Sequence, residues 1–360
     1  MQTDRVLFQL LAKALNEDYC LDPTIFENVD WEEVMSLASK QGVNGLAFDS
    51  LESIPIASRP NRNQLLKWLG QSVYIEKVND GYTQTVVELV DKLTAEGVRV
   101  VVLKGLACAS WYPNPLHRNS GDFDCFLCGD FDKGNDIALK IGCRLNCAYY
   151  KHSEFMYKKV NVENHRFMLN IRGNKNLKAL EKHLHELLYD RLVGEREYVT
   201  DSNIEIPCAD FNALFLLVHT FTHFMDEGVK LKQLCDWAMF LKQNQDKVNW
   251  HELYSWAERL RMKCFACAIT DIAVRYLGVN LRNTDVMIDD TFSDRILVDA
   301  LYESESIHNK GYSHVRKLYV LAKSMLKNNW KYKDIYQKNA ILELIRMGWF
   351  YAVERNPKIE

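Results

Sequence analysis

The sequence predicts an α+β protein in which a mixed α/β region separates two helical ones. Through residues 1–97, apolar side chains recur at the spacing of one helix face. Between 98 and 207, short runs rich in β-branched residues alternate with helical segments. Helical spacing returns from 208 to 360. We therefore predict three domains: an N-terminal helical region (1–97), an α/β core (98–207) and a C-terminal helical domain (208–360).

The N-terminal region is predicted to consist of helices separated by short breaks. The first helix is indicated by an apolar stripe of Leu7, Leu10, Leu11, Ala14 and Leu15. Asp30 is a suitable N-cap for a second helix, because a glutamate follows three residues later as in a capping box. Gly42 and Gly45 are expected to interrupt the helical pattern. After a proline-containing loop, a long helix is predicted over about 65–95, ending at Gly97.

The remaining elements follow from the same patterns. In the middle region, apolar runs predict strands at 98–103, 123–127, 154–158, 160–163 (continuing toward 169) and 204–206. A helix is expected at 136–141, and residues 181–192 form either a helix or an irregular insertion. In the C-terminal region, helices are predicted at 211–226, 231–241, 250–276, 292–302, 313–327 and 340–351.

The composition argues against several classes of protein. A net charge of −3 gives no overall basic surface of the kind that binds polynucleotides, so nucleic acid is not expected as a partner. No signal peptide is recognisable, and no apolar stretch is long enough to span a bilayer. The ten cysteines are scattered through apolar runs, as buried reduced thiols would be. We therefore expect a cytoplasmic protein with no membrane partner.

Four cysteines have a spacing that roughly resembles a zinc site. They are Cys125, Cys128, Cys143 and Cys147. The first two are three residues apart on a predicted strand, so their side chains face opposite sides of the sheet. This arrangement is wrong for a zinc knuckle, and we favour buried structural cysteines.

Two aspartates on one predicted strand are the strongest functional signal. Asp122 and Asp124 are separated by one residue, so their side chains point to the same face, with Phe123 and Cys125 on the opposite, buried face. Carboxylates held side by side repel each other unless a cation or proton lies between them. A divalent metal ion that handles a nucleoside triphosphate is one strong reason for such a pair.

Phosphate contacts are predicted just before this pair. Lys104 and Gly105 follow a predicted strand and precede a short helix, where free amides, a close backbone approach and a point charge favour phosphate. An ordinary β–α turn is the alternative. Arg118 precedes Asp122 by four residues and would fork onto phosphate oxygens. Its alternatives are a solvated loop position or a salt bridge to one of the aspartates.

Two-metal phosphoryl transfer usually needs a third carboxylate beside such a pair. Glu163 is the best candidate, on a predicted strand where it shares a face with His165. If that strand lies beside the strand of the two aspartates, Glu163 completes a triad. The alternative is an exposed strand glutamate.

Polar side chains in the C-terminal region point to a cleft. His219 and His223 lie four residues apart on a predicted helix, and Asp236 lies on the next helix. We favour residues that line a cleft between the domains. Buried core polar residues and a zinc site are the alternatives.

These motifs resemble the bacterial uncharacterised nucleotidyltransferase family of the DNA polymerase β-type nucleotidyltransferase superfamily. The matching stretches read V-L-K-G, Y-P-x-P-x-x-R-x-x-G-D-F-D, V-E-x-H, H-x-x-x-H and L-x-x-L-x-D-W, and they occupy 102–105, 112–124, 162–165, 219–223 and 231–237. In order and spacing, the resemblance extends over roughly residues 5–280.

The resemblance implies a nucleotidyltransferase core built on a small mixed β-sheet. It implies that Mg²⁺, as two ions, binds to Asp122, Asp124 and Glu163, and that a nucleoside triphosphate is the substrate. The residues expected to bind the nucleotide are Lys104, Gly105, Arg118 and Gly121. Those expected to line the acceptor cleft are His165, His219, His223 and Asp236.

The leading hypothesis is an Mg²⁺-dependent nucleotidyltransferase that acts on a hydroxyl of a small molecule, a sugar or a protein. A second hypothesis is a nucleotide-binding regulatory protein that has lost catalysis, because a fold and its site can outlive turnover. The three retained carboxylates favour the enzyme. An enzyme that acts on a polynucleotide is a weaker third hypothesis, because the net charge is acidic.

Overall fold

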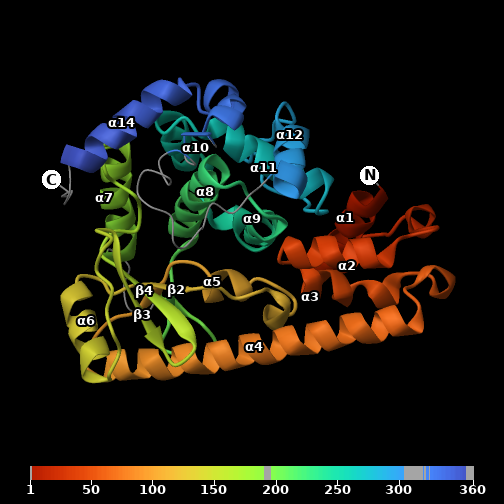
Figure 1. The fold of residues 1–360 in the computed structure, drawn as a ribbon, viewed down its shortest axis with the longest axis horizontal. Coiled ribbons are helices and arrows are strands. Elements are labelled where there is room, and N and C mark those ends of the chain that lie inside the picture. The colour runs from red at the N-terminus through yellow and green to blue at the C-terminus, as the bar shows by residue number, and fades with distance from the viewer. Residues whose placement is uncertain (1, 190–195, 304–318, 320–321, 324, 354–360) are drawn as a thin grey trace.

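A six-stranded sheet lies beneath C-terminal helices, and the first helices of the chain lie to one side of it (Figure 1). The computed structural model describes residues 2–189, 196–303, 319, 322–323 and 325–353. This arrangement is α+β and confirms the predicted fold class. The division into three domains stays a prediction. No helix within the described ranges is both long and apolar enough to cross a membrane.

Short helices form the N-terminal layer. They are α1 (Gln2–Leu15), α2 (Trp31–Lys40) and α3 (Asn44–Asp49). Asp30 caps α2 as predicted, since its carboxylate accepts a hydrogen bond from the Glu33 amide. The prediction that Gly45 interrupts the helical pattern is wrong, because Gly45 lies inside α3. A Cβ at this position would come within 3.0 Å of the His117 carbonyl oxygen, so the glycine serves close packing.

The long helix α4 (Arg62–Ala95) runs beneath both the N-terminal helices and the sheet (Figure 1). It starts earlier than predicted because Asn61 caps it in a capping box with Gln64. At its other end, the Val98 amide donates to the Leu93 carbonyl, and Gly97 adopts a φ of +76°. This is a Schellman motif, so Val98 belongs to the end of the helix and not to the predicted strand.

The sheet has the strand order β3-β4-β2-β1-β6-β5. The strands are β1 (Val101–Val102), β2 (Phe123–Phe126), β3 (His152–Tyr157), β4 (Val160–His165), β5 (Glu197–Tyr198) and β6 (Glu205–Ile206). β1 is shorter than the predicted run because that run begins in the helix cap. β5 was not predicted; it is a two-residue exposed strand. The parallel pair β2–β4 lies between antiparallel pairs, so the sheet is mixed.

Three helices connect the strands. They are α5 (Leu106–Ala109), α6 (Phe131–Lys140) and α7 (Lys175–Tyr189). α6 begins before the predicted start and includes Gly134, where a Cβ would lie 2.1 Å from a Leu127 methyl carbon. α7 resolves the open alternative at 181–192 in favour of a helix as far as Tyr189, and the remaining residues of that segment lie outside the described ranges.

The C-terminal helices pack above the sheet (Figure 1). They are α8 (Ala209–Asp226), α9 (Leu231–Asn244), α10 (Trp250–Arg259), α11 (Lys263–Arg275), α12 (Ser293–Val298) and α14 (Ala340–Val353). The single helix predicted at 250–276 is wrong, because Arg261 has a φ of +59° and the Met262 amide closes α10. Most of the helix predicted at 313–327 lies outside the described residues.

Two further turns depart from the predicted helices. α12 continues as a π-helical turn (Asp299–Glu303) at the end of the predicted helix at 292–302, and a second π-helical turn (Lys331–Ile335) was not predicted.

Buried side chains of the N-terminal helices share one hydrophobic cluster with the C-terminal helices. A second cluster joins the sheet to the last turns of α4.

Candidate active site

The two strands that carry the predicted carboxylates are neighbours in the sheet. β2 pairs in parallel with β4, and Asp124 lies opposite Glu163 in the register. Asp122 directly precedes β2 and is exposed, whereas Asp124 is only 3% exposed. The condition set for Glu163, that its strand lies beside the strand of the two aspartates, is therefore met.

Asp124 is a buried carboxylate with two cationic or proton-bearing neighbours. Its Oδ2 lies 3.2 Å from Lys104 Nζ, and its Oδ1 lies 3.1 Å from His165 Nε2. Burial alone would raise the pKa of Asp124, but Lys104 and the hydrogen bond with His165 hold that pKa well below its ordinary value. The carboxylate is therefore ionised at neutral pH.

Asp122 lies among like charges. Partial burial raises the pKa of its carboxyl, and the negative charges of Glu163 and Asp124 raise it further, against a hydrogen bond from Asn161 that lowers it. The three carboxylates thus repel one another, and a cation between them would relieve this repulsion.

Glu163 is held between two imidazoles. Its Oε2 lies 3.2 Å from His152 Nδ1 and 3.3 Å from His165 Nε2. His165 was expected in the acceptor cleft, but it is 2% exposed and lies among the carboxylates. His152 comes from β3, where it pairs in register with His165, and sequence reasoning did not identify it.

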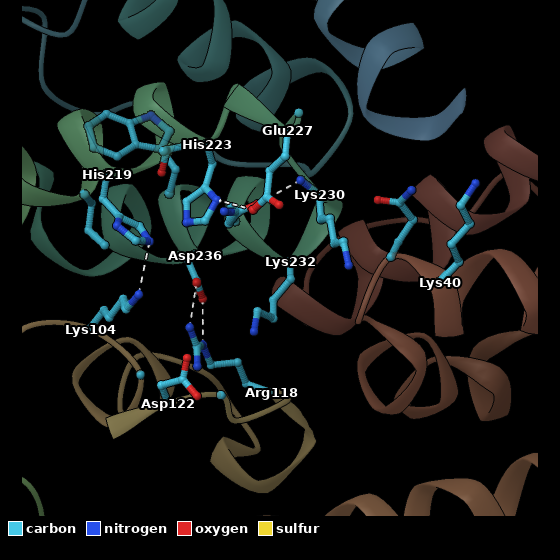
Figure 2. Close-up of a pocket in the computed structure, with 18 residues that line it drawn as sticks. Lys40, Lys104, Arg118, Asp122, His219, His223, Glu227, Lys230, Lys232 and Asp236 are labelled. Atoms are coloured by element: carbon cyan, nitrogen blue, oxygen red, sulfur yellow. Dashed lines mark hydrogen bonds and ion pairs between the residues drawn. The ribbon is translucent and has the colours of Figure 1, made fainter. Parts of the chain in front are cut away.

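The turn at Lys104 and Gly105 joins the carboxylates to the pocket. Gly105 has a φ of +65°, which favours glycine, and the helix that follows it is a single turn, α5. Lys104 Nζ lies 3.4 Å from His219 Nε2 on α8 (Figure 2). Burial, together with the positive charge of Lys104, holds the pKa of His219 well below its ordinary value. A neutral His219 can therefore accept a hydrogen bond from the lysine.

Arg118 and Asp236 form a buried ion pair. Arg118 Nε lies 2.8 Å from Asp236 Oδ1, and Nη2 lies 2.7 Å from Oδ2 (Figure 2). The Tyr112 hydroxyl also donates to Asp236, at 2.8 Å. The alternative of a salt bridge to Asp122 or Asp124 does not apply, because the arginine fork is directed at α9.

A pocket of about 480 Å³ lies between the sheet, α2, α8 and α9. Figure 2 shows Lys40, Lys230 and Lys232 along one side and Lys104 on the other. Residues from the predicted nucleotide and acceptor sets also line it, namely Gly105, Arg118, Gly121, His219, His223 and Asp236. The three lysines of the first side were not identified from the sequence, because no local pattern marks them.

The zinc alternatives are not supported within the described residues. There, the His, Cys, Asp and Glu side chains close enough to share a metal ion are His152, Glu163 and His165. Asp236 is engaged by Arg118, and His223 Nδ1 lies 2.7 Å from Glu227 Oε1. The four cysteines with zinc-like spacing form no such group in this part of the chain, and all are free thiols.

Comparison with known proteins gives one match. Residues 27–278 match the family described as "Uncharacterised nucleotidyltransferase". No curated protein and no solved structure matches the chain. The matched range includes the three carboxylates, the turn at Lys104 and the helices α8 and α9. Because the match spans more than half of the chain, the protein belongs to this uncharacterised nucleotidyltransferase family.

Proposed function

We propose that the protein transfers a nucleoside monophosphate from a nucleoside triphosphate to an acceptor hydroxyl, with release of pyrophosphate and with Mg²⁺ as cofactor. The acceptor is a small molecule, a sugar or a protein. The proposal rests on the in-register pairing of Asp124 with Glu163, beside a cationic pocket that Asp122 and Lys104 line. The carboxylates would thus hold the metal ions, and the adjacent cationic side chains would neutralise the phosphates of the metal-bound triphosphate.

The carboxylates fit a divalent cation. Asp124 Oδ2 is buried and accepts no hydrogen bond from the described residues, although Lys104 lies within ion-pair distance. Asp122, Asp124 and Glu163 would hold Mg²⁺, as two ions. When bound, Mg²⁺ would neutralise triphosphate oxygens and lower the pKa of the acceptor hydroxyl. Glu163 would also take up the proton of that hydroxyl.

The pocket lysines would bind the phosphates. Once a metal ion neutralises the carboxylates, the Lys104 ammonium would leave its ion pair with Asp124 and pair with a triphosphate oxygen instead. Arg118 uses Nε and Nη2 for Asp236, and Nη1 makes only a 3.4 Å contact with the Asn119 carbonyl. This leaves one edge of the guanidinium for phosphate, beside the backbone of Gly105 and Gly121.

A thermal-shift titration tests the nucleotide site. Wild type is titrated with ATP, GTP, CTP and UTP, each with and without Mg²⁺, alongside the Asp122→Asn/Asp124→Asn variant. We expect a Mg²⁺-dependent rise in melting temperature that the double variant loses, because a ligand that binds only the folded state stabilises it. Asp246→Asn, in an exposed ion pair, is the matched control and should keep the shift.

Transfer itself is tested with the preferred nucleotide and a panel of acceptors. Asp124→Asn should abolish product formation while the protein remains folded, and full activity in this variant would refute the mechanism. Binding without product across the acceptors would favour the inactive regulatory protein. Its structural support is that Lys104 Nζ already lies 3.2 Å from Asp124 Oδ2 and compensates its charge.

A further inference from the structure

Glu163 lies at the centre of a cluster with two histidines. The ligand atoms of His152, Glu163 and His165 all lie within 4.8 Å of one another. Asp124 Oδ1 adjoins the cluster, 3.1 Å from His165 Nε2. The two imidazole rings meet edge to face, with centroids 5.1 Å apart. Oxygen and nitrogen atoms from three adjacent strands therefore converge on one small volume.

The second nitrogen of His165 fixes its tautomer. His165 Nδ1 lies 3.1 Å from the carbonyl oxygen of Phe167, which can only accept, so Nδ1 carries a hydrogen. Nε2 can then donate to Asp124 only when the ring is a protonated imidazolium, whereas in the neutral ring Nε2 has a bare lone pair that can bind a metal ion. That lone pair faces oxygens of Asp124 and Glu163 at 3.1 and 3.3 Å. Lone pairs at such distances repel unless a proton or a metal ion lies between them.

His152 has the same arrangement with the roles of its two ring nitrogens exchanged. Its Nε2 lies 3.1 Å from Glu154 Oε1, so this nitrogen is the donor. Its Nδ1 is buried without a hydrogen-bond partner among the described residues, yet it lies 3.2 Å from Glu163 Oε2. Metal-binding histidines characteristically donate their other ring N–H to a carboxylate or a backbone carbonyl, which orients the ring. His152 and His165 show one of each.

We propose that His152, Glu163 and His165 form a nitrogen-containing site for a divalent transition-metal ion, with Asp124 beside it and with Mn²⁺ preferred over Mg²⁺. This inference rests on the proposed function, since it specifies the ion for one position of the same site. Ligand atoms about 2.1 Å from an ion and at right angles to each other are about 3 Å apart, close to the 3.2 and 3.3 Å that separate Glu163 Oε2 from the nitrogens of His152 and His165. Imidazole favours transition metals, carboxylate suits Mn²⁺, and Mg²⁺ prefers oxygen and water.

Metal binding is measured on the full chain without nucleotide. The chelator-treated protein is titrated with Mn²⁺, and the free ion is followed by its EPR signal; Mg²⁺ is then added as competitor. We expect one Mn²⁺ site at least tenfold tighter than the Mg²⁺ site. Pulsed EPR of the bound Mn²⁺ should show coupling to ¹⁴N, which an all-oxygen site cannot give.

Variants then assign the nitrogen ligands. His152→Ala should weaken Mn²⁺ binding at least tenfold and reduce the ¹⁴N coupling, and His152→Gln should do the same if the alanine variant does not fold. His251→Ala is the matched control, since His251 is an exposed histidine on α10. Absence of ¹⁴N coupling in wild type would overturn the proposal. Unchanged Mn²⁺ binding in a folded His152 variant would also overturn it.

The outcome is separable from that of the proposed function. Nucleotidyl transfer with Mg²⁺ alone, together with Mn²⁺ that shows no ¹⁴N coupling, would leave the function standing and remove this site. Nitrogen-bound Mn²⁺ without transfer to any acceptor would establish this metal site and remove the proposed function.

Discussion

Replacing Asp236 by Asn should destabilise the protein strongly, because Arg118 would be left as a buried cation without a counter-ion. The side chains of the two residues are 5% and 9% exposed, and their two contacts are 2.8 and 2.7 Å long. An asparagine keeps the shape and one acceptor oxygen, but its NH₂ group would face an N–H donor of Arg118. Breaking a buried ion pair of this kind costs about 3–5 kcal/mol.

An exposed ion pair of the same residue types provides the control. Arg282 Nη2 lies 2.9 Å from Asp246 Oδ2, and both side chains are 57% exposed. Asp246→Asn should cost at most about 1 kcal/mol, because solvent screens the pair. The free energy of unfolding of wild type and both variants is measured by urea denaturation.

A loss below about 1 kcal/mol for Asp236→Asn would refute the reasoning. It would show that Arg118 reaches another partner or solvent. The guanidinium would then be free for phosphate in the way that the sequence motif suggests.

Other predictions concern the pocket and two glycines. Burial, followed by the charge of Arg118, lowers the pKa of Lys232 to about 8, so nucleotide affinity measured by calorimetry should fall as the pH rises through 8, and Lys232→Met should flatten this dependence. Because this pKa lies below the ordinary value of 10.5, ionisation of Lys232 opposes folding, and the penalty builds as the pH falls from 10.5 and is complete below about 8. The free protein with Lys232→Met should therefore melt no lower than wild type, and a lower melting temperature would contradict the argument. Gly45→Ala should destabilise α3 by about 1–3 kcal/mol, because its Cβ would press on the His117 backbone. Gly70→Ala on α4, where no atom lies within 4 Å, should instead stabilise the protein by about 0.5–1 kcal/mol, and equal melting temperatures for the two variants would show that packing does not decide.

Local spacing predicts the parts of the site that lie on single elements. Period-two alternation puts Asp122 and Asp124 on one face of their strand, and it puts Glu163 and His165 on one face of a second strand. The strand and helix types follow from the same apolar periodicity. Errors arise mainly at element ends, where a Schellman motif at Val98 or a positive φ at Arg261 decides the boundary.

Contacts between distant segments depend on the tertiary structure. Strand order brings His152 beside Glu163, and helix packing directs Asp236 toward Arg118 rather than toward His219 and His223. No local pattern encodes these distances, because the partners are separated by many residues and meet only when their elements pack. The sequence by itself therefore determined the element types and the carboxylate-bearing strands. Only the tertiary structure decided which cations and imidazoles surround those carboxylates, since burial and register are properties of the whole fold.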